Sequence, residues 1–428
     1  MSSQMSFDMS LLRSKQVLVF CLGWLSYAST YLLRKPLGVV KTDLEQSLHI
    51  PREKLGWLDT ALLLPYAFMQ ILLGSVGDKI GPRKTFGFCL VFSGLSMMTF
   101  GMWSNFTTFV ILLFLNGTAQ AQCWPNCVKV LGEWFPERLR NSVFGMFGTC
   151  AFGGGIIGTA LAVYLQTSYG WRNAFTLPSI IVLSFGILVF MLFQQPNELN
   201  IEVPGKENQN PTEEKKKMSY FEIMKIPMVF DVALAVFCLK VVRYCMFMWL
   251  PMYLYNELKY SKSKAGIFSI AFEVGGVLGS ALIGFVMDRF FSKGPLFGTG
   301  ISVLLSAISL LMFSWTSHWG VYFNNIFMFL AGAFNCGPDS ILGAAVPSRI
   351  GELNGRNAGA AVVGFVNGFG SIGTVIEGPI IGIASTMYGW SGMFYLMIAL
   401  SLIGTFTVFK AAYTQKTIDT HNAVFQEV

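Results

Sequence analysis

Charged residues are scarce in this chain of 428 residues: Asp, Glu, Lys and Arg make up 12%, whereas hydrophobic residues make up 53%. Soluble globular domains carry about 25% charged residues, which cover the core with a polar surface. The composition therefore excludes a soluble globular protein and indicates a polytopic membrane protein.

Histidine is also rare, and candidate metal ligands do not cluster. The three histidines, His49, His318 and His421, form no ligand set with the eight cysteines, all of which fall in apolar segments. Buried thiols behave as small hydrophobic side chains, so we expect neither a metal site nor a disulfide. No nucleophile with a nearby base is evident, so we expect no enzyme activity and no cofactor.

A cleavable secretory signal is not evident, because Asp8, Arg13 and Lys15 precede an uninterrupted apolar segment. A helix needs about 20 apolar residues to cross a bilayer. Segments of this length predict an all-α membrane protein with 12 transmembrane helices. They cover residues 16–40, 55–76, 85–103, 108–131, 142–165, 173–194, 229–254, 264–287, 297–315, 320–345, 358–384 and 391–411.

Lysine and arginine collect in the loops that follow the even-numbered segments, as in cytoplasmic loops of membrane proteins. Arg138 and Arg140 follow the fourth segment, and Lys215, Lys216 and Lys217 lie in the central loop. The loops after segments 1 and 7 carry mixed charges and weaken the contrast. We predict that both termini are cytoplasmic. These loops also explain the net charge of +7, so the expected partner is the lipid bilayer and not a nucleic acid.

A polar stretch at 194–220 divides the chain into two similar blocks of six segments. Arg34 and Arg243 are 209 positions apart, and further residues repeat at slowly growing spacings. Two similar halves with a substrate site between them, near the membrane midplane, are typical of secondary transporters. The predicted domains are an N-terminal six-helix bundle at 1–195, a cytoplasmic central loop at 196–226, and a C-terminal six-helix bundle with a short cytoplasmic tail at 227–428.

Arg34 and Arg243 lie inside apolar segments, where a lipid-facing arginine would cost about 2.5–3.5 kcal/mol or more. We therefore expect both to face a protein-lined cavity that contains water and binds an anion. Two alternatives remain: Arg34 could reach the outer interface by snorkelling, and Arg243 could form a structural ion pair with an acid such as Glu273.

Other polar residues share helical faces with these arginines. Arginine binds phosphate oxygens in a bidentate manner, and a phosphate monoester carries about −1.5 to −2 charges. The predicted substrate-binding residues are Arg34, Arg243, Lys240, Lys129, Tyr27, Tyr31, Tyr66, Gln70, Tyr244, Asn126 and Asn367. Alternatively, Lys129 could snorkel from its place near a helix end, and the tyrosines could be ordinary packing residues.

Carboxylates in apolar surroundings are the candidates for gating. Asp59, Glu273 and Glu377 lie inside predicted spans, and we expect them to exchange salt bridges with the arginines as the site empties or reorients. For Asp339 and Glu377, helix capping or a structural ion pair is an equally good explanation.

Two loop motifs resemble the inner-loop signature of the major facilitator superfamily: GDKIGPRK at 77–84 and its degenerate copy GFVMDRFFSKG at 284–294. The resemblance implies the major facilitator fold of two pseudo-symmetric six-helix bundles. It also implies that Asp78 and Arg83, with Asp288 in the second copy, latch neighbouring helix ends. The predicted gating and coupling residues are thus Asp59, Glu273, Glu377, Asp78, Arg83 and Asp288.

Within that superfamily, nearly the whole chain resembles the organophosphate:phosphate antiporters, and especially their eukaryotic sugar-phosphate exchanger branch. The segments that carry this resemblance are YLLRKPLGVVK at 31–41, WPNCVKVLGEWF at 124–135, KVVRY with WLPMYL within 240–254, FEVGGVLGS at 272–280 and NGFGSIGTVIEGP at 367–379. The chain departs from the bacterial members, which carry a cavity histidine on the fifth helix and a cavity lysine where Gln70 aligns. This departure leaves the organic part of the cargo open.

The predicted function is exchange of a phosphorylated organic metabolite, such as glucose-6-phosphate or glycerol-3-phosphate, for inorganic phosphate. In this prediction the halves alternate access, and the anion is held between Arg34 and Arg243. The alternatives are a transporter of carboxylates or other organic anions and a non-transporting sugar-phosphate sensor. We expect a monomer, and the eukaryotic-like motifs favour the endoplasmic reticulum or another internal membrane over the plasma membrane.

Overall fold

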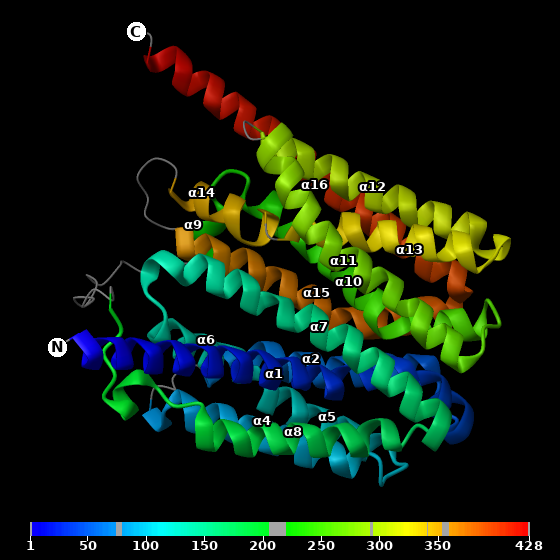
Figure 1. Cartoon of the computed structure of the whole chain (residues 1–428). Helices are drawn as coiled ribbons and strands as arrows, with labels where there is room; N and C mark the ends of the chain where they lie inside the picture. The colour runs from blue at the N-terminus through cyan, green and yellow to red at the C-terminus, as the bar shows by residue number, and fades with distance from the viewer. Residues whose placement is uncertain are drawn as a thin grey trace. The chain divides into compact units, whose positions relative to one another are not determined.

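The computed structural model describes residues 2–73, 79–204, 220–291, 294–339, 341–352 and 359–426, and all regular structure in this part is helical (Figure 1). The α-helices are α1 (Ser2–Leu48), α2 (Arg52–Leu72), α4 (Pro82–Phe100), α5 (Phe106–Ala121), α6 (Cys123–Trp134), α7 (Glu137–Tyr169), α8 (Asn173–Leu192), α9 (Tyr220–Met224), α10 (Val229–Asn256), α11 (Lys262–Phe290), α12 (Pro295–Thr316), α13 (Val321–Cys336), α14 (Val346–Glu352), α15 (Gly359–Met387) and α16 (Gly389–Gln426). Short 3-10 helices η1 (Pro196–Leu199) and η2 (Ser317–Trp319) and a π-helix η3 (Ile341–Ala345) complete the set.

Each of the twelve predicted segments overlaps helical structure in the described part of the chain. Within the described ranges, ten helical stretches are long and apolar enough to cross a membrane; α2 and α4 are helical but fall outside that set. The chain is therefore an all-helical membrane protein, as its composition predicts.

Two of the predicted segments are interrupted, at equivalent places in the two halves. The fourth segment breaks at Gln122, between α5 and α6, and the tenth breaks at Gly337, after α13. Pro125 lies in the first turn of α6, and Pro338 directly follows Gly337. Proline lacks a backbone N–H and is tolerated at the start of a helix but not in its interior, which explains a new helix start at each place.

Helix packing repeats within the two halves. In the first half α1 packs on α7 and α8, and α4 packs on α5 and α8; in the second half α10 packs on α15 and α16, and α12 packs on α13 and α16. Figure 1 shows α4 beside α8. The same pairs recur in chain order, so the repeat found in the sequence is also a repeat of tertiary packing.

Contacts divide the chain into two compact units: Met1–Ile50 with Ala61–Glu213, and Pro51–Thr60 with Glu214–Val428. The first part of α2 thus belongs to the second unit, where the Thr60 hydroxyl donates to the Val375 carbonyl oxygen at 2.7 Å. The domain boundaries expected from the sequence, at 1–195, 196–226 and 227–428, stay a prediction.

A glycine permits the closest helix crossing in each unit. A Cβ on Gly117 of α5 would overlap the Leu62 carbonyl oxygen of α2, and a Cβ on Gly332 of α13 would overlap the Phe272 carbonyl oxygen of α11. Small residues let helix backbones approach closely in membranes, where packing drives association. Gly117 and Gly332 are 215 positions apart, so this crossing belongs to the internal repeat.

We predict that Gly332→Ala lowers the thermal unfolding temperature of the detergent-solubilised protein, because overpacking of this kind costs about 1–3 kcal/mol. The matched control is Gly364→Ala in α15, where an added Cβ meets nothing within 4 Å and Ala favours the helix by up to about 1 kcal/mol. Equal unfolding temperatures for the two variants would contradict the close crossing.

Candidate functional site

Arg34 lies on α1 in the first unit and is 7% exposed. Its Nε donates a hydrogen bond to Oε1 of Gln120 on α5. The guanidinium carbon lies 4.9 Å from the centroid of the Tyr31 ring and 4.4 Å from that of the Tyr66 ring. These contacts bury the guanidinium among side chains of the first unit and orient its plane.

Gln120 is the centre of a buried polar network that the sequence analysis missed. Its amide nitrogen donates to Asn116 Oδ1 at 2.9 Å, to Ser93 Oγ at 3.1 Å and to the Thr30 carbonyl oxygen at 3.4 Å. The Ser93 hydroxyl also donates to Asn116 Oδ1, at 2.5 Å. Asn116 and Gln120 are one helical turn apart in a predicted membrane span, and this spacing was a signal that could have found them.

The tyrosines predicted for this site do gather near Arg34. The hydroxyls of Tyr27 and Tyr66 lie 3.5 Å apart, and the rings of Tyr27 and Tyr31 pack edge to face with centroids 6.1 Å apart. The ring of Trp124 on α6 packs against Tyr27 at 4.9 Å. Arg34 is therefore surrounded by aromatic rings whose hydroxyls can form hydrogen bonds.

Three further predicted residues of the first unit are placed differently. Asn126 is buried, but its amide donates to the Gln122 carbonyl oxygen at 2.7 Å, within its own helix. Lys129 is exposed on α6. The side chain of Gln70 lies outside the described residues.

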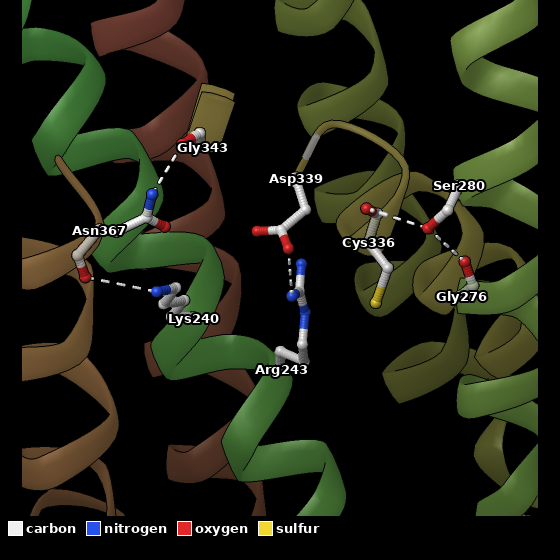
Figure 2. Close-up of polar contacts among 8 residues, drawn as sticks. All are labelled: Lys240, Arg243, Gly276, Ser280, Cys336, Asp339, Gly343 and Asn367. Carbon is white, nitrogen blue, oxygen red and sulfur yellow. Dashed lines mark hydrogen bonds and ion pairs between the residues drawn. The ribbon is translucent and has the colours of Figure 1, made fainter. Parts of the chain in front are cut away.

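In the second unit, Lys240 and Arg243 project from α10 in different directions (Figure 2). Lys240 Nζ donates to the Asn367 carbonyl oxygen of α15 at 3.4 Å. The Asn367 amide donates to the Gly343 carbonyl oxygen of η3 at 2.7 Å and to that of Val363 at 3.2 Å. The predicted residues Lys240 and Asn367 thus meet where α10, α15 and η3 come together.

Arg243 is 8% exposed, and its Nη1 forms an ion pair with Asp339 Oδ2 at 3.0 Å. The acid that pairs with it is therefore Asp339, whose role the sequence left open. Tyr244, the next residue, is half-buried, with its ring 5.8 Å from that of Phe247. The second unit therefore contains a buried cation with a charge-assisted contact to a carboxylate.

The predicted gating residues fall into three groups. Asp59, Glu273 and Glu377 are buried, and Asp59 lies against Gly378, the neighbour of Glu377, in the second unit. Arg83 forms an ion pair at 3.2 Å with Glu198, in the segment that follows α8. Asp78 and the side chain of Asp288 lie outside the described residues. Among residues the structure does describe, no three His, Cys, Asp or Glu side chains group as metal ligands.

Comparison with known proteins agrees with this architecture. The model of the Major Facilitator Superfamily matches residues 19–362. The chain belongs to this superfamily. It is therefore an integral, multi-pass membrane transporter and not an enzyme, as expected from the sequence.

Relatives within the superfamily handle phosphorylated metabolites according to their names. The chain is 29% identical to human sugar phosphate exchanger 3, over 90% of each chain. It is 30% identical to the putative glycerol-3-phosphate transporter 5 of Arabidopsis thaliana, over 92% of this chain and 90% of the relative. The expected relationship to sugar phosphate exchangers and glycerol-3-phosphate transporters is confirmed.

Among solved structures, an inward-facing bacterial homologue of the human lysosomal transporter Spinster matches with a TM-score of 0.77, at 15% identity, over 94% of this chain and 97% of that one. At this identity the similarity concerns the fold alone. The major facilitator fold expected from the loop motifs is confirmed.

We predict that Gln120→Ala lowers the thermal unfolding temperature. The substitution removes the acceptor of Arg34 and leaves buried polar groups without a hydrogen-bond partner, which costs about 1–3 kcal/mol of stability. Ser184→Ala is the control, since that exposed hydroxyl donates to the Ile180 carbonyl oxygen of its own helix. If both variants unfold at the wild-type temperature, the network around Arg34 does not stabilise the fold.

Proposed function

We propose that this transporter exchanges a phosphorylated organic metabolite for inorganic phosphate by alternating access, with Arg34 and Arg243 binding the anion. The observation that carries the proposal is one arginine per unit, over nine-tenths buried, at equivalent points of the first long helix of each repeat. The named activities of the sugar phosphate exchangers and glycerol-3-phosphate transporters support the same cargo class.

The chemistry of phosphate favours arginine at both places. A guanidinium presents a planar fork of N–H donors that matches two phosphate oxygens, whereas the ammonium of lysine is a point charge. The bond from Arg34 Nε to Gln120 holds that fork in one plane. Lys240, one turn before Arg243, adds a second positive charge in the second unit.

The aromatic surroundings of Arg34 suit the organic part of the cargo. Tyr27, Tyr31 and Tyr66 offer hydroxyl groups and ring faces next to the guanidinium. A sugar or glycerol group presents both hydroxyls and C–H surfaces, which such side chains bind through hydrogen bonds and packing. We therefore propose a small polyol phosphate such as glucose-6-phosphate or glycerol-3-phosphate.

Organic carboxylates are the second candidate cargo, and one observation favours them. Arg243 holds a carboxylate, Asp339, in the structure. A transporter of carboxylates would use the same contact with an external anion. Competition between phosphate and carboxylates for uptake separates these two candidates.

The remaining parts of the proposal concern topology and place. The basic loops support cytoplasmic termini by the positive-inside rule. We propose a monomer in the endoplasmic reticulum or another internal membrane. Protease protection of tags at each terminus, in sealed vesicles, tests the orientation.

The test of the function is uptake of labelled phosphate by liposomes that contain the purified protein. Vesicles are preloaded with phosphate or left empty, and sugar phosphates, glycerol-3-phosphate or dicarboxylates are added outside. Faster uptake into loaded vesicles, inhibited by one organophosphate, supports exchange. Inhibition by a dicarboxylate alone supports the second candidate. Binding of an organophosphate without any uptake indicates a sensor.

We predict that Arg34→Lys and Arg243→Lys each reduce phosphate exchange at least tenfold, because lysine keeps the charge but loses the bidentate fork, worth about 1.5–3 kcal/mol. Arg13→Gln is the matched control, since Arg13 lies exposed on the same helix as Arg34. Wild-type exchange in both lysine variants, with the proteins folded and inserted, would remove the arginine pair from the proposal.

A further inference from the structure

We infer that Asp339 is a tethered anion: its carboxylate occupies Arg243 while the site is empty, and the cargo binds by displacing it. The inference rests on the proposed function, in that the cargo is an anion bound by Arg243. It gives a specific role to the ion pair at 3.0 Å between Asp339 Oδ2 and Arg243 Nη1 (Figure 2).

The fold itself does not require an acid at this position. Gly117 and Gly332 mark equivalent helix crossings 215 positions apart, and the same spacing places Asp339 opposite Trp124. Trp124 packs its ring against Tyr27 in the first unit. The repeat therefore supplies an arginine in both units, whereas the position of Asp339 in the second unit corresponds to an aromatic residue in the first.

The two partners differ in how firmly the protein holds them. The Arg243 side chain is 10% exposed, and that of Asp339 is 42% exposed. Asp339 follows the break at Gly337 and precedes the π-helix η3, so it lies close to two irregularities of the helical structure. The arginine is buried, whereas the carboxylate that pairs with it is partly exposed. An incoming anion therefore meets the carboxylate before it meets the guanidinium.

Asp339 pairs with one of the three nitrogen atoms of the Arg243 guanidinium, Nη1. The Nε and Nη2 of Arg243 are buried and have no hydrogen-bond partner within the described part of the chain. A carboxylate at Nη1 leaves these donors to a larger anion, because a phosphate group has three terminal oxygens that can accept from two nitrogens together. This difference gives phosphate an advantage over the tethered acid.

Displacement of Asp339 from Arg243 would affect the contacts of the neighbouring helices. Lys240 is the second positively charged neighbour of Asp339. Its Nζ donates to the Asn367 carbonyl oxygen. The Asn367 amide in turn holds Gly343 of η3, a few residues after Asp339. π-Helical segments are frequent at functional sites, and here one receives a hydrogen bond from Asn367 of α15.

The charge balance explains why a transporter would keep such an acid. Lys240 and Arg243 are one turn apart on α10 and repel each other, and Asp339 lowers the charge of the group from +2 to +1 while no cargo is bound. In its absence the empty site should bind phosphate more tightly and release it more slowly. Asp339 thus sets a moderate affinity, which turnover requires.

The test compares Asp339→Asn with wild type and with Asp231→Asn. Asp231 pairs with Lys410 at 2.9 Å in the same unit, so its variant also breaks one ion pair of α10 but lies elsewhere on that helix. Binding of inorganic phosphate is measured by calorimetry on purified protein, and phosphate exchange is measured in liposomes over a range of concentrations.

We expect Asp339→Asn to bind phosphate about tenfold more tightly, equivalent to about 1.4 kcal/mol. Its half-saturation concentration and its maximal exchange rate should both fall, because bound phosphate leaves slowly. Asp231→Asn should keep both wild-type values. Asp339→Glu keeps a carboxylate and should stay near wild type, whereas Asp339→Ser should behave like Asp339→Asn and replaces it if the amide variant does not fold.

A purely structural role for Asp339 predicts lower stability and equal or weaker phosphate affinity in the neutral variants, and that result would overturn the inference. If wild type exchanges phosphate and Asp339→Asn shows unchanged affinity, the inference fails while the proposed function stands. If folded wild type and all variants bind no phosphate, the proposed function fails and takes the inference with it.

Discussion

The burial of a guanidinium among apolar helices is the constraint on which the rest of this structure depends. A charged group removed from water must find donors, acceptors or counter-charges inside the protein. Arg34 meets that need with Gln120 and two tyrosine rings, and Arg243 meets it with Asp339. Each arginine therefore determines which polar groups its neighbouring helices must carry.

The scaffold repeats but the site does not. In both units a glycine lies at the same helix crossing, and the helix that contains this glycine is interrupted a few residues later. They also pair their helices in the same order. The partner of the arginine, by contrast, is a neutral amide in one unit and an acid in the other. Close packing needs small residues at fixed places, whereas the polar partners of a buried arginine can differ between the units as long as they satisfy its charge.

Membership in the Major Facilitator Superfamily accounts for this combination of a repeated scaffold and an internal polar site. Arg34 donates to a neutral amide and Arg243 pairs with an acid. The two buried arginines of one chain therefore have chemically different neighbours.

The sequence by itself determined the membrane class, the helical segments and the two-fold repeat. Hydrophobic length and spacing along the chain are local properties, so the twelve segments and the equivalence of Arg34 and Arg243 could be read without a structure. Pro125 and Pro338 were visible too, although the helix breaks beside them were not predicted.

Only the tertiary structure decided which partner each arginine has. The sequence offered Glu273 as a possible acid for Arg243, but the ion pair in the structure is with Asp339. Gln120, 86 positions from Arg34, was not considered. Contacts between helices depend on their rotation and crossing, and these follow from packing across the whole unit. Helical periodicity within one segment specifies a face, and the neighbouring helices decide what that face meets.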